Sequence, residues 1–88
     1  MTILCDVYRS PRHDLMYLYV RQEDGLSRVP GELLQRFGEP VRALSFELSA
    51  DRRLAREDPE KVLLNLEAHG YHLQLPPVGR RLPGSAPE

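Results

Sequence analysis

Apolar and polar positions alternate in two stretches near the start of the chain, residues 2–9 and 15–20. Successive side chains of a β-strand point to opposite faces of its sheet, so this alternation predicts two strands. The segment SPRHD between them contains Pro11 and Asp14, two residue types that favour turns. The pattern therefore predicts a β-hairpin whose loop is Pro11–Asp14.

This loop length sets the expected pairing, in which Ser10 lies opposite Leu15 and Cys5 lies opposite Val20. The pairing sorts the side chains into an aliphatic face and a tyrosine face. The aliphatic face comprises Ile3, Cys5, Val7, Met16, Leu18 and Val20. The tyrosine face comprises Leu4, Asp6, Tyr8, Tyr17 and Tyr19. Because apolar side chains occur on both faces, we expect a helix to cover each of them.

A short helix and a third strand are expected after the hairpin. The segment VPGELLQRFGEP places Pro30 at the first helical position and Gly38 at the C-terminal cap. The apolar stripe of this helix consists of Leu33, Leu34 and Phe37. Residues 41–48 alternate again and predict a strand, with Leu44, Phe46 and Leu48 on one face and Val41 and Ala43 on the other.

The clearest helix signal begins at Asp58, a favoured N-cap, with Pro59 at the first helical position and Gly70 at the end. Residues 71–75 alternate and predict a fourth strand. Two prolines follow it and end the pairing, because proline has no backbone donor. The segment SADRRLAR before the second helix can form one additional helical turn.

The element order is thus ββαβαβ, which predicts an α+β fold with about four strands. We expect an α/β/α sandwich, a small sheet flanked by helices on both faces. Residues 1–77 are expected to form this single domain. Residues 78–88 contain two prolines, two glycines and few apolar side chains, a composition that predicts a disordered tail.

Composition narrows the class of protein. The net charge is -1, whereas nonspecific nucleic-acid binders carry a clear basic excess. We expect no signal peptide at the start of the chain, and no apolar run approaches the ~18 residues of a transmembrane helix. The single cysteine, Cys5, suits a reducing compartment. We therefore expect a cytoplasmic protein without membrane association.

Five segments resemble, in order and spacing, the YcgL family of small proteobacterial proteins. They are LCDVYRS, MYLYV, SRVPGELLQRFGEP, LAREDPEKV and GYHLQLPP. The resemblance covers about residues 3–77. Two positions depart from the family pattern, Gly31 in place of the more frequent glutamate and Tyr71-His72 in place of an aromatic pair. The resemblance implies a compact α/β/α sandwich. It implies no activity and no site residues.

The chain carries no recognisable reaction chemistry. It has no GxSxG elbow and no glycine-rich phosphate loop. Cys5 lies mid-strand between apolar neighbours, which predicts an inert buried thiol. His13, His69 and His72 are expected to diverge, so they do not form a metal site. We therefore expect neither an enzyme nor a cofactor or metal.

The candidate binding surface is an arginine–tyrosine rim at one end of the sheet. It comprises Arg9, Arg12, Tyr17, Tyr19 and Arg28, brought together by the loops SPRHD and EDGLSR. Such a rim is typical of protein interfaces and also suits an anionic group. The tyrosine face would otherwise pack under a helix or form a platform on which nucleic-acid bases stack.

Two functions follow from this surface. The first is a non-enzymatic cytoplasmic interaction module that binds a protein partner through the rim or through an exposed edge strand. The alternative is an accessory protein of RNA metabolism that contacts nucleic acid directly through the same rim. The carboxylate of Asp6 among the tyrosines would repel phosphate, and this favours the protein partner. The identity of the partner and the oligomeric state stay open.

Overall fold

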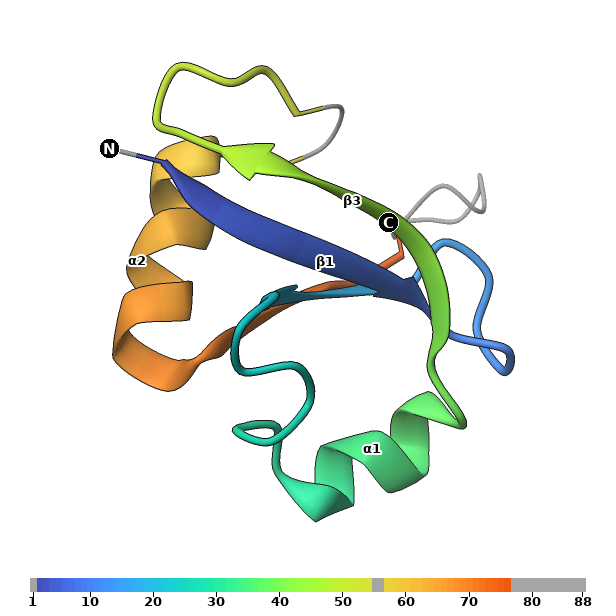
Figure 1. Ribbon diagram of the computed structural model, residues 1–88. Helices are drawn as coiled ribbons and strands as arrows, with labels where there is room; N and C mark the ends of the chain where they lie inside the picture. The colour runs from blue at the N-terminus through green and yellow to red at the C-terminus, as the bar shows by residue number, and fades with distance from the viewer. Residues whose placement is uncertain (1, 55–56, 77–88) are drawn as a thin grey trace.

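Four antiparallel strands form one sheet in the order β3-β1-β2-β4 in the computed structural model (Figure 1). The structure describes residues 2–54 and 57–76. The strands are β1 (Ile3–Arg9), β2 (Tyr17–Arg21), β3 (Val41–Leu48) and β4 (Tyr71–Gln74), and the helices are α1 (Gly31–Phe37) and α2 (Pro59–His69). The predicted α+β class and ββαβαβ order are confirmed. The tail expected at residues 78–88 lies outside the described residues.

The pairing of β1 with β2 differs from the predicted pairing by one residue. Cys5 lies opposite Arg21 and Val7 lies opposite Tyr19. The loop is longer than expected because the Ser10 N–H donates to the Met16 carbonyl (3.0 Å) and Leu15 adopts a left-handed conformation with φ of 63°. The Ser10 hydroxyl oxygen also accepts hydrogen bonds from two backbone N–H groups of the loop. These contacts hold a wider turn than Pro11–Asp14 alone.

The shifted pairing turns β2 over relative to β1. Tyr17 and Tyr19 share a face with Cys5 and Val7, whereas Tyr8 lies on the opposite face. The predicted tyrosine face is therefore wrong. Both faces of this hairpin carry apolar side chains, so the criterion of sidedness that normally fixes register could not discriminate between the two pairings.

The buried apolar side chains form two hydrophobic clusters, one on each face of the sheet. The first contains Cys5, Val7, Tyr19, Leu48 and, from α2, Val62 and Leu66. The second contains Leu18, Val20, Val29 and, from α1, Phe37. Because the neighbours Leu18 and Tyr19 belong to different clusters, both faces of the sheet contribute to the core.

The helix ends follow the predicted capping residues closely. The Asp58 side chain accepts a hydrogen bond from the Glu60 N–H (3.0 Å), and Pro59 begins α2. Gly70 ends α2 in the left-handed conformation. In α1, Pro30 is the N-cap and not the first helical residue, so the helix starts one position later than predicted.

The described part of the segment SADRRLAR forms a turn and no helix, with the Arg52 N–H donating to the Ser49 carbonyl (3.1 Å). No helix within the described ranges is long and apolar enough to cross a membrane.

Strand β3 contains a bulge. Leu44 lies opposite Val7 and Arg42 lies opposite Tyr8, so Ala43 has no partner on β1. The bulge brings the side chain of Arg42 onto the face of the sheet that Ser45 and Glu47 share. Val41 shares the opposite face with Leu44, Phe46 and Leu48, contrary to the prediction for Val41.

Candidate functional site

A groove of about 370 Å³ opens on the sheet face that α2 partly covers. Its lining residues are Val7, Arg9, Leu15, Tyr17, Tyr19, Ala43, Leu44 and Gln74. We call it the sheet groove. Helix α2 lies beside the end of the sheet where β1 begins (Figure 1), and the sheet groove occupies the same face toward the hairpin loop.

Two rows of paired residues build the sheet groove. In the first row Leu44, Val7 and Tyr19 lie side by side on β3, β1 and β2. In the second row Arg9 lies opposite Tyr17, and Tyr17 lies opposite Gln74. The strands thus place these side chains on one face by regular alternation, and only Leu15 and Ala43 come from the loop and the bulge.

Apolar side chains at the mouth of the sheet groove are open to solvent. Leu44 is 49% exposed and Leu15 is 44% exposed, whereas Val7 and Tyr19 beneath them are buried. Arg9 is exposed beside them. Within residues 2–54 and 57–76, no carboxylate forms an ion pair with its guanidinium. The sheet groove therefore combines an apolar floor with the guanidinium of Arg9, which no described carboxylate pairs with.

Tyr19 fixes the base of the sheet groove. Its hydroxyl donates to the Gln74 side-chain carbonyl (2.9 Å), and its ring packs edge-on against His72 with 5.6 Å between centroids. Burial raises the pKa of the Tyr19 phenol to about 12, with a further contribution from the negative charge of Glu57. The hydroxyl stays protonated at neutral pH and serves as a structural donor.

His72 is buried and engaged through both ring nitrogens. Asn65 Nδ2 lies 2.8 Å from Nδ1, and Glu57 Oε1 contacts Nε2. With the Asn65 amide donating to Nδ1, Nε2 carries the proton and donates to Glu57. His69, by contrast, is exposed at the end of α2. His72 thus links β4 to α2 and to the segment before that helix.

Cys5 is completely buried among the residues of the first cluster. Burial, together with a smaller effect of the nearby Asp6 carboxylate, raises the pKa of its thiol to about 12. The thiol is a poor nucleophile under these conditions, because the thiolate is the reactive form. The predicted burial of Cys5 is confirmed.

The predicted rim assembles only in part. Arg9, Tyr17 and Tyr19 meet in the sheet groove. Arg12 instead contacts Gly38 near the end of α1. The side chain of Arg28 packs against Gly70 and lies 4.0 Å from Asp24.

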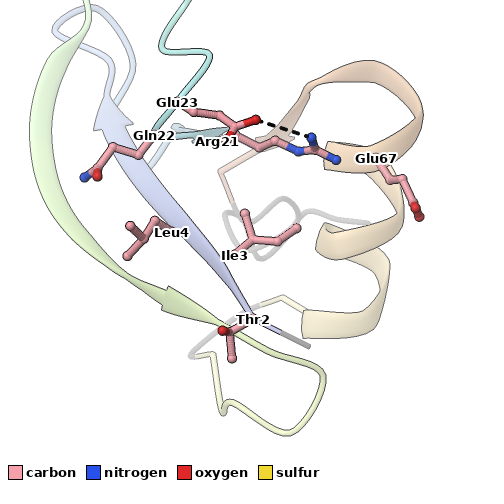
Figure 2. A pocket seen from close by; sticks show the side chains of 7 residues that line it. All are labelled: Thr2, Ile3, Leu4, Arg21, Gln22, Glu23 and Glu67. Atoms are coloured by element: carbon pink, nitrogen blue, oxygen red, sulfur yellow. Dashed lines mark ion pairs between the residues drawn. The ribbon is translucent and has the colours of Figure 1, made fainter.

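A larger hollow of about 720 Å³ lies at the other end of the sheet (Figure 2). Figure 2 shows Ile3 and Leu4 pointing to opposite sides of β1, so the hollow wraps around the strand. Arg21 within it is 4.0 Å from Glu23, and Glu67 of α2 adds a second carboxylate. Its apolar lining comes from Ile3 and Leu4, and its arginine already lies near a carboxylate.

Sequence reasoning missed five residues of the sheet groove: Val7, Leu15, Ala43, Leu44 and Gln74. The alternation of VRALSFEL predicted that Leu44 lies on one face of the sheet. It gave no sign that the helices leave this part of the face exposed to solvent. Gln74 carried a weak signal, since a polar side chain in a short strand requires a hydrogen-bond partner when buried.

Comparison with known proteins gives one consistent result. The sequence profile of the YcgL domain matches residues 5–77. The chain is 56% identical over 78 residues to a YcgL domain-containing protein of Stutzerimonas stutzeri (strain A1501), covering 89% of this chain and 80% of that protein. It is 57% identical over 77 residues to one of Azotobacter vinelandii (strain DJ / ATCC BAA-1303), covering 88% and 79% respectively.

Proposed function

The chain belongs to the YcgL domain family, and we propose that it is a non-enzymatic protein-interaction module. In this proposal the sheet groove binds an extended segment of a partner protein. The segment presents an apolar side chain to the groove and an acidic side chain to Arg9. The observation that carries the proposal is the exposure of Leu44 and Leu15 above a buried apolar floor.

The apolar part of the proposal rests on surface exposure. Leu15 and Leu44 come from different segments and are exposed at one hollow, together with the half-buried Tyr17. Covering such side chains removes apolar surface from water, which contributes about 25 cal/mol per Å² before the costs of association. An apolar side chain in the sheet groove would thus gain free energy without displacing a structural contact.

The acidic part of the proposal rests on Arg9. Its guanidinium lies at the rim of an apolar hollow, where a carboxylate from a partner gains a charge-assisted and often bidentate hydrogen bond. Tyr17, directly opposite Arg9 in the sheet, offers a flat ring beside the same position. Arginine and tyrosine are both enriched at protein interfaces.

The non-enzymatic part of the proposal rests on the state of the reactive groups. Cys5 and Tyr19 are both held protonated by burial, and both nitrogens of His72 are already hydrogen-bonded. None of these groups is poised as a base or nucleophile. We further propose that the sheet with its two helices is an α/β/α sandwich, and that the protein acts in the cytoplasm, where a lone thiol stays reduced.

Direct binding of nucleic acid has less support. Tyr8 lies on the other face of the sheet, and neither Arg12 nor Arg28 lines the sheet groove. The aromatic platform is thereby reduced to Tyr17, and the basic rim to Arg9. We therefore treat RNA binding as an outcome of the test.

Selection from a random peptide library tests the proposal. We expect the selected peptides to share an apolar residue next to aspartate or glutamate. Arg9→Glu should weaken their binding about tenfold or more, because a charged hydrogen bond contributes about 1.5–3 kcal/mol. Leu44→Ser should weaken it as well, since the apolar wall is lost.

Two matched variants serve as controls. Leu64→Ser makes the same change at an exposed leucine of α2, and Arg53→Glu makes the same charge reversal in an exposed loop. Both should bind the selected peptides as the parent does. The proposal would be contradicted if the selected peptides bound all four variants equally. It would also be contradicted if the protein preferred single-stranded RNA, with an affinity that falls steeply as salt rises.

A further inference from the structure

Strand β3 is an edge of the sheet. Its one neighbour among the described strands is β1, and its outer side faces away from the sheet (Figure 1). Five consecutive residues, 41–45, are exposed. The unpaired backbone groups of such an edge are a template for another strand.

The hydrogen bonds of β1 show which backbone groups of β3 point outward. The Gln22 N–H donates to the Leu4 carbonyl (2.9 Å) and the Ser10 N–H donates to the Met16 carbonyl, so the even-numbered residues of β1 bond to β2. The odd-numbered residues, Cys5 among them, must then bond to β3. Cys5 lies opposite Phe46. Phe46 therefore bonds inward, and the N–H and carbonyl groups of Ser45 and Glu47 point out of the sheet.

The bulge makes this edge self-complementary. Ala43 has no partner on β1, so Arg42 and Glu47 share a face of the sheet. They pair with Tyr8 and Leu4, and each of these lies two residues from Asp6, the partner of Ser45. A twofold axis through Ser45 would bring Arg42 of one chain opposite Glu47 of a second chain. Without the bulge the two side chains would point to opposite faces.

We propose that β3 pairs antiparallel with β3 of a second copy of this chain, centred on Ser45. In this register the two Ser45 residues exchange both backbone hydrogen bonds, and Arg42 and Glu47 form a symmetric pair of ion pairs. Such a contact is isologous, so each interaction occurs twice. The result is one continuous sheet of two chains.

The apolar face of β3 agrees with the same register. Leu44 of one chain lies opposite Phe46 of the other, at a position without hydrogen bonds where side chains approach most closely. Leu44 is 49% exposed in the single chain, and Phe46 is half-buried under Arg52, whose guanidinium lies 4.6 Å from the ring centroid. Pairing would cover both side chains.

Existing contacts are compatible with this pairing. Arg42 Nη2 binds Asp6 (3.2 Å), yet its side chain is 58% exposed, which leaves the remaining guanidinium donors for Glu47 of the second copy. The Glu47 carbonyl accepts a long contact of 3.5 Å from Arg52 Nη1. This contact agrees with an outward carbonyl, and the second copy would replace it.

Sedimentation and amide exchange of the full chain test the pairing. On raising the concentration from about 10 μM to about 1 mM, within the range of weak interfaces, the average mass should rise from the 10.1 kDa of one chain toward twice that value. Over the same range, the Ser45 and Glu47 amides should become protected from exchange. The inward Phe46 amide should be protected throughout. A constant mass of one chain would overturn the proposal.

Charge reversal at Glu47 tests the register. Glu47→Arg sets arginines opposite each other and should lower the dimer association constant at least tenfold. Glu67→Arg, the same change on the exposed surface of α2, should leave it unchanged. A dimer that survives Glu47→Arg would contradict this register. Glu47 does not line the sheet groove, and this measurement contains no peptide. A failure of the pairing is therefore distinguishable from a failure of peptide binding, although pairing would cover Leu44 at the mouth of the sheet groove.

Discussion

Asp6 is nearly inaccessible to solvent, at 2% exposure, yet it is charged. It accepts hydrogen bonds from Gln22 Nε2 (3.1 Å), Arg42 Nη2 (3.2 Å) and the Ser45 hydroxyl. Burial alone would raise the pKa of this carboxyl, but these hydrogen bonds and the charge of Arg42 together lower it. Asp6 therefore ties β1 to β3 and to the end of β2, and it does not lie among tyrosines as the sequence suggested.

Asp6→Asn should destabilise the fold in a pH-dependent way. A carboxyl whose pKa is lower in the folded state contributes stability above its unfolded pKa of about 3.9 and loses it as the pH falls through the folded value. At pH 7 we expect a loss of about 1–3 kcal/mol in the free energy of unfolding. The difference between the two proteins should shrink below about pH 4.

Urea denaturation across this pH range measures the effect. Asp51→Asn, at an exposed position of the turn before α2, is the matched control and should behave as the parent. A constant difference between parent and Asp6→Asn at every pH would show that the ionised carboxylate is not what stabilises the sheet.

At the scale of elements, the helix ends were predictable and the hairpin register was not. Asp58 and Gly70 act through their own backbone and the adjacent turn, so their chemistry is local. The register of β1 and β2 depends instead on how far the turn extends. Here the backbone hydrogen bond of Ser10 and the left-handed conformation of Leu15 determine the length of the turn. A non-glycine residue with positive φ is uncommon, so the sequence gives no clear sign of it.

Gly70→Ala and Gly31→Ala should have opposite effects on stability. Gly70 has φ of 86°, and an added Cβ would lie 2.5 Å from Arg28 Nε. The left-handed conformation alone costs an alanine about 1–2 kcal/mol, so the free energy of unfolding should fall by at least that amount. Gly31 has open space around it, and alanine there should add up to about 1 kcal/mol. Thermal denaturation of both variants checks this, and shifts of equal sign would refute it.

At the scale of the whole molecule, the sheet groove exists because α2 covers only part of one face of the sheet. The sequence predicted that Arg9, Tyr17 and Tyr19 gather at one end of the sheet, and the structure places all three in one groove. Arg12 and Arg28 could not be placed, because their positions depend on how the loops pack against Gly38 and Gly70. The strand order β3-β1-β2-β4, which brings Leu44 beside Val7, was likewise outside the reach of local patterns.

The proposed function depends on the sheet groove being a recognition surface. The most direct test is a titration of the ¹⁵N-labelled chain with a selected acidic–apolar peptide, followed by amide chemical shifts. We predict saturable shifts at Tyr17, Leu44 and Gln74, with the amides of α1 unchanged. Saturable shifts confined to α1 or to the hollow around Arg21, with those three amides unmoved, would contradict the account.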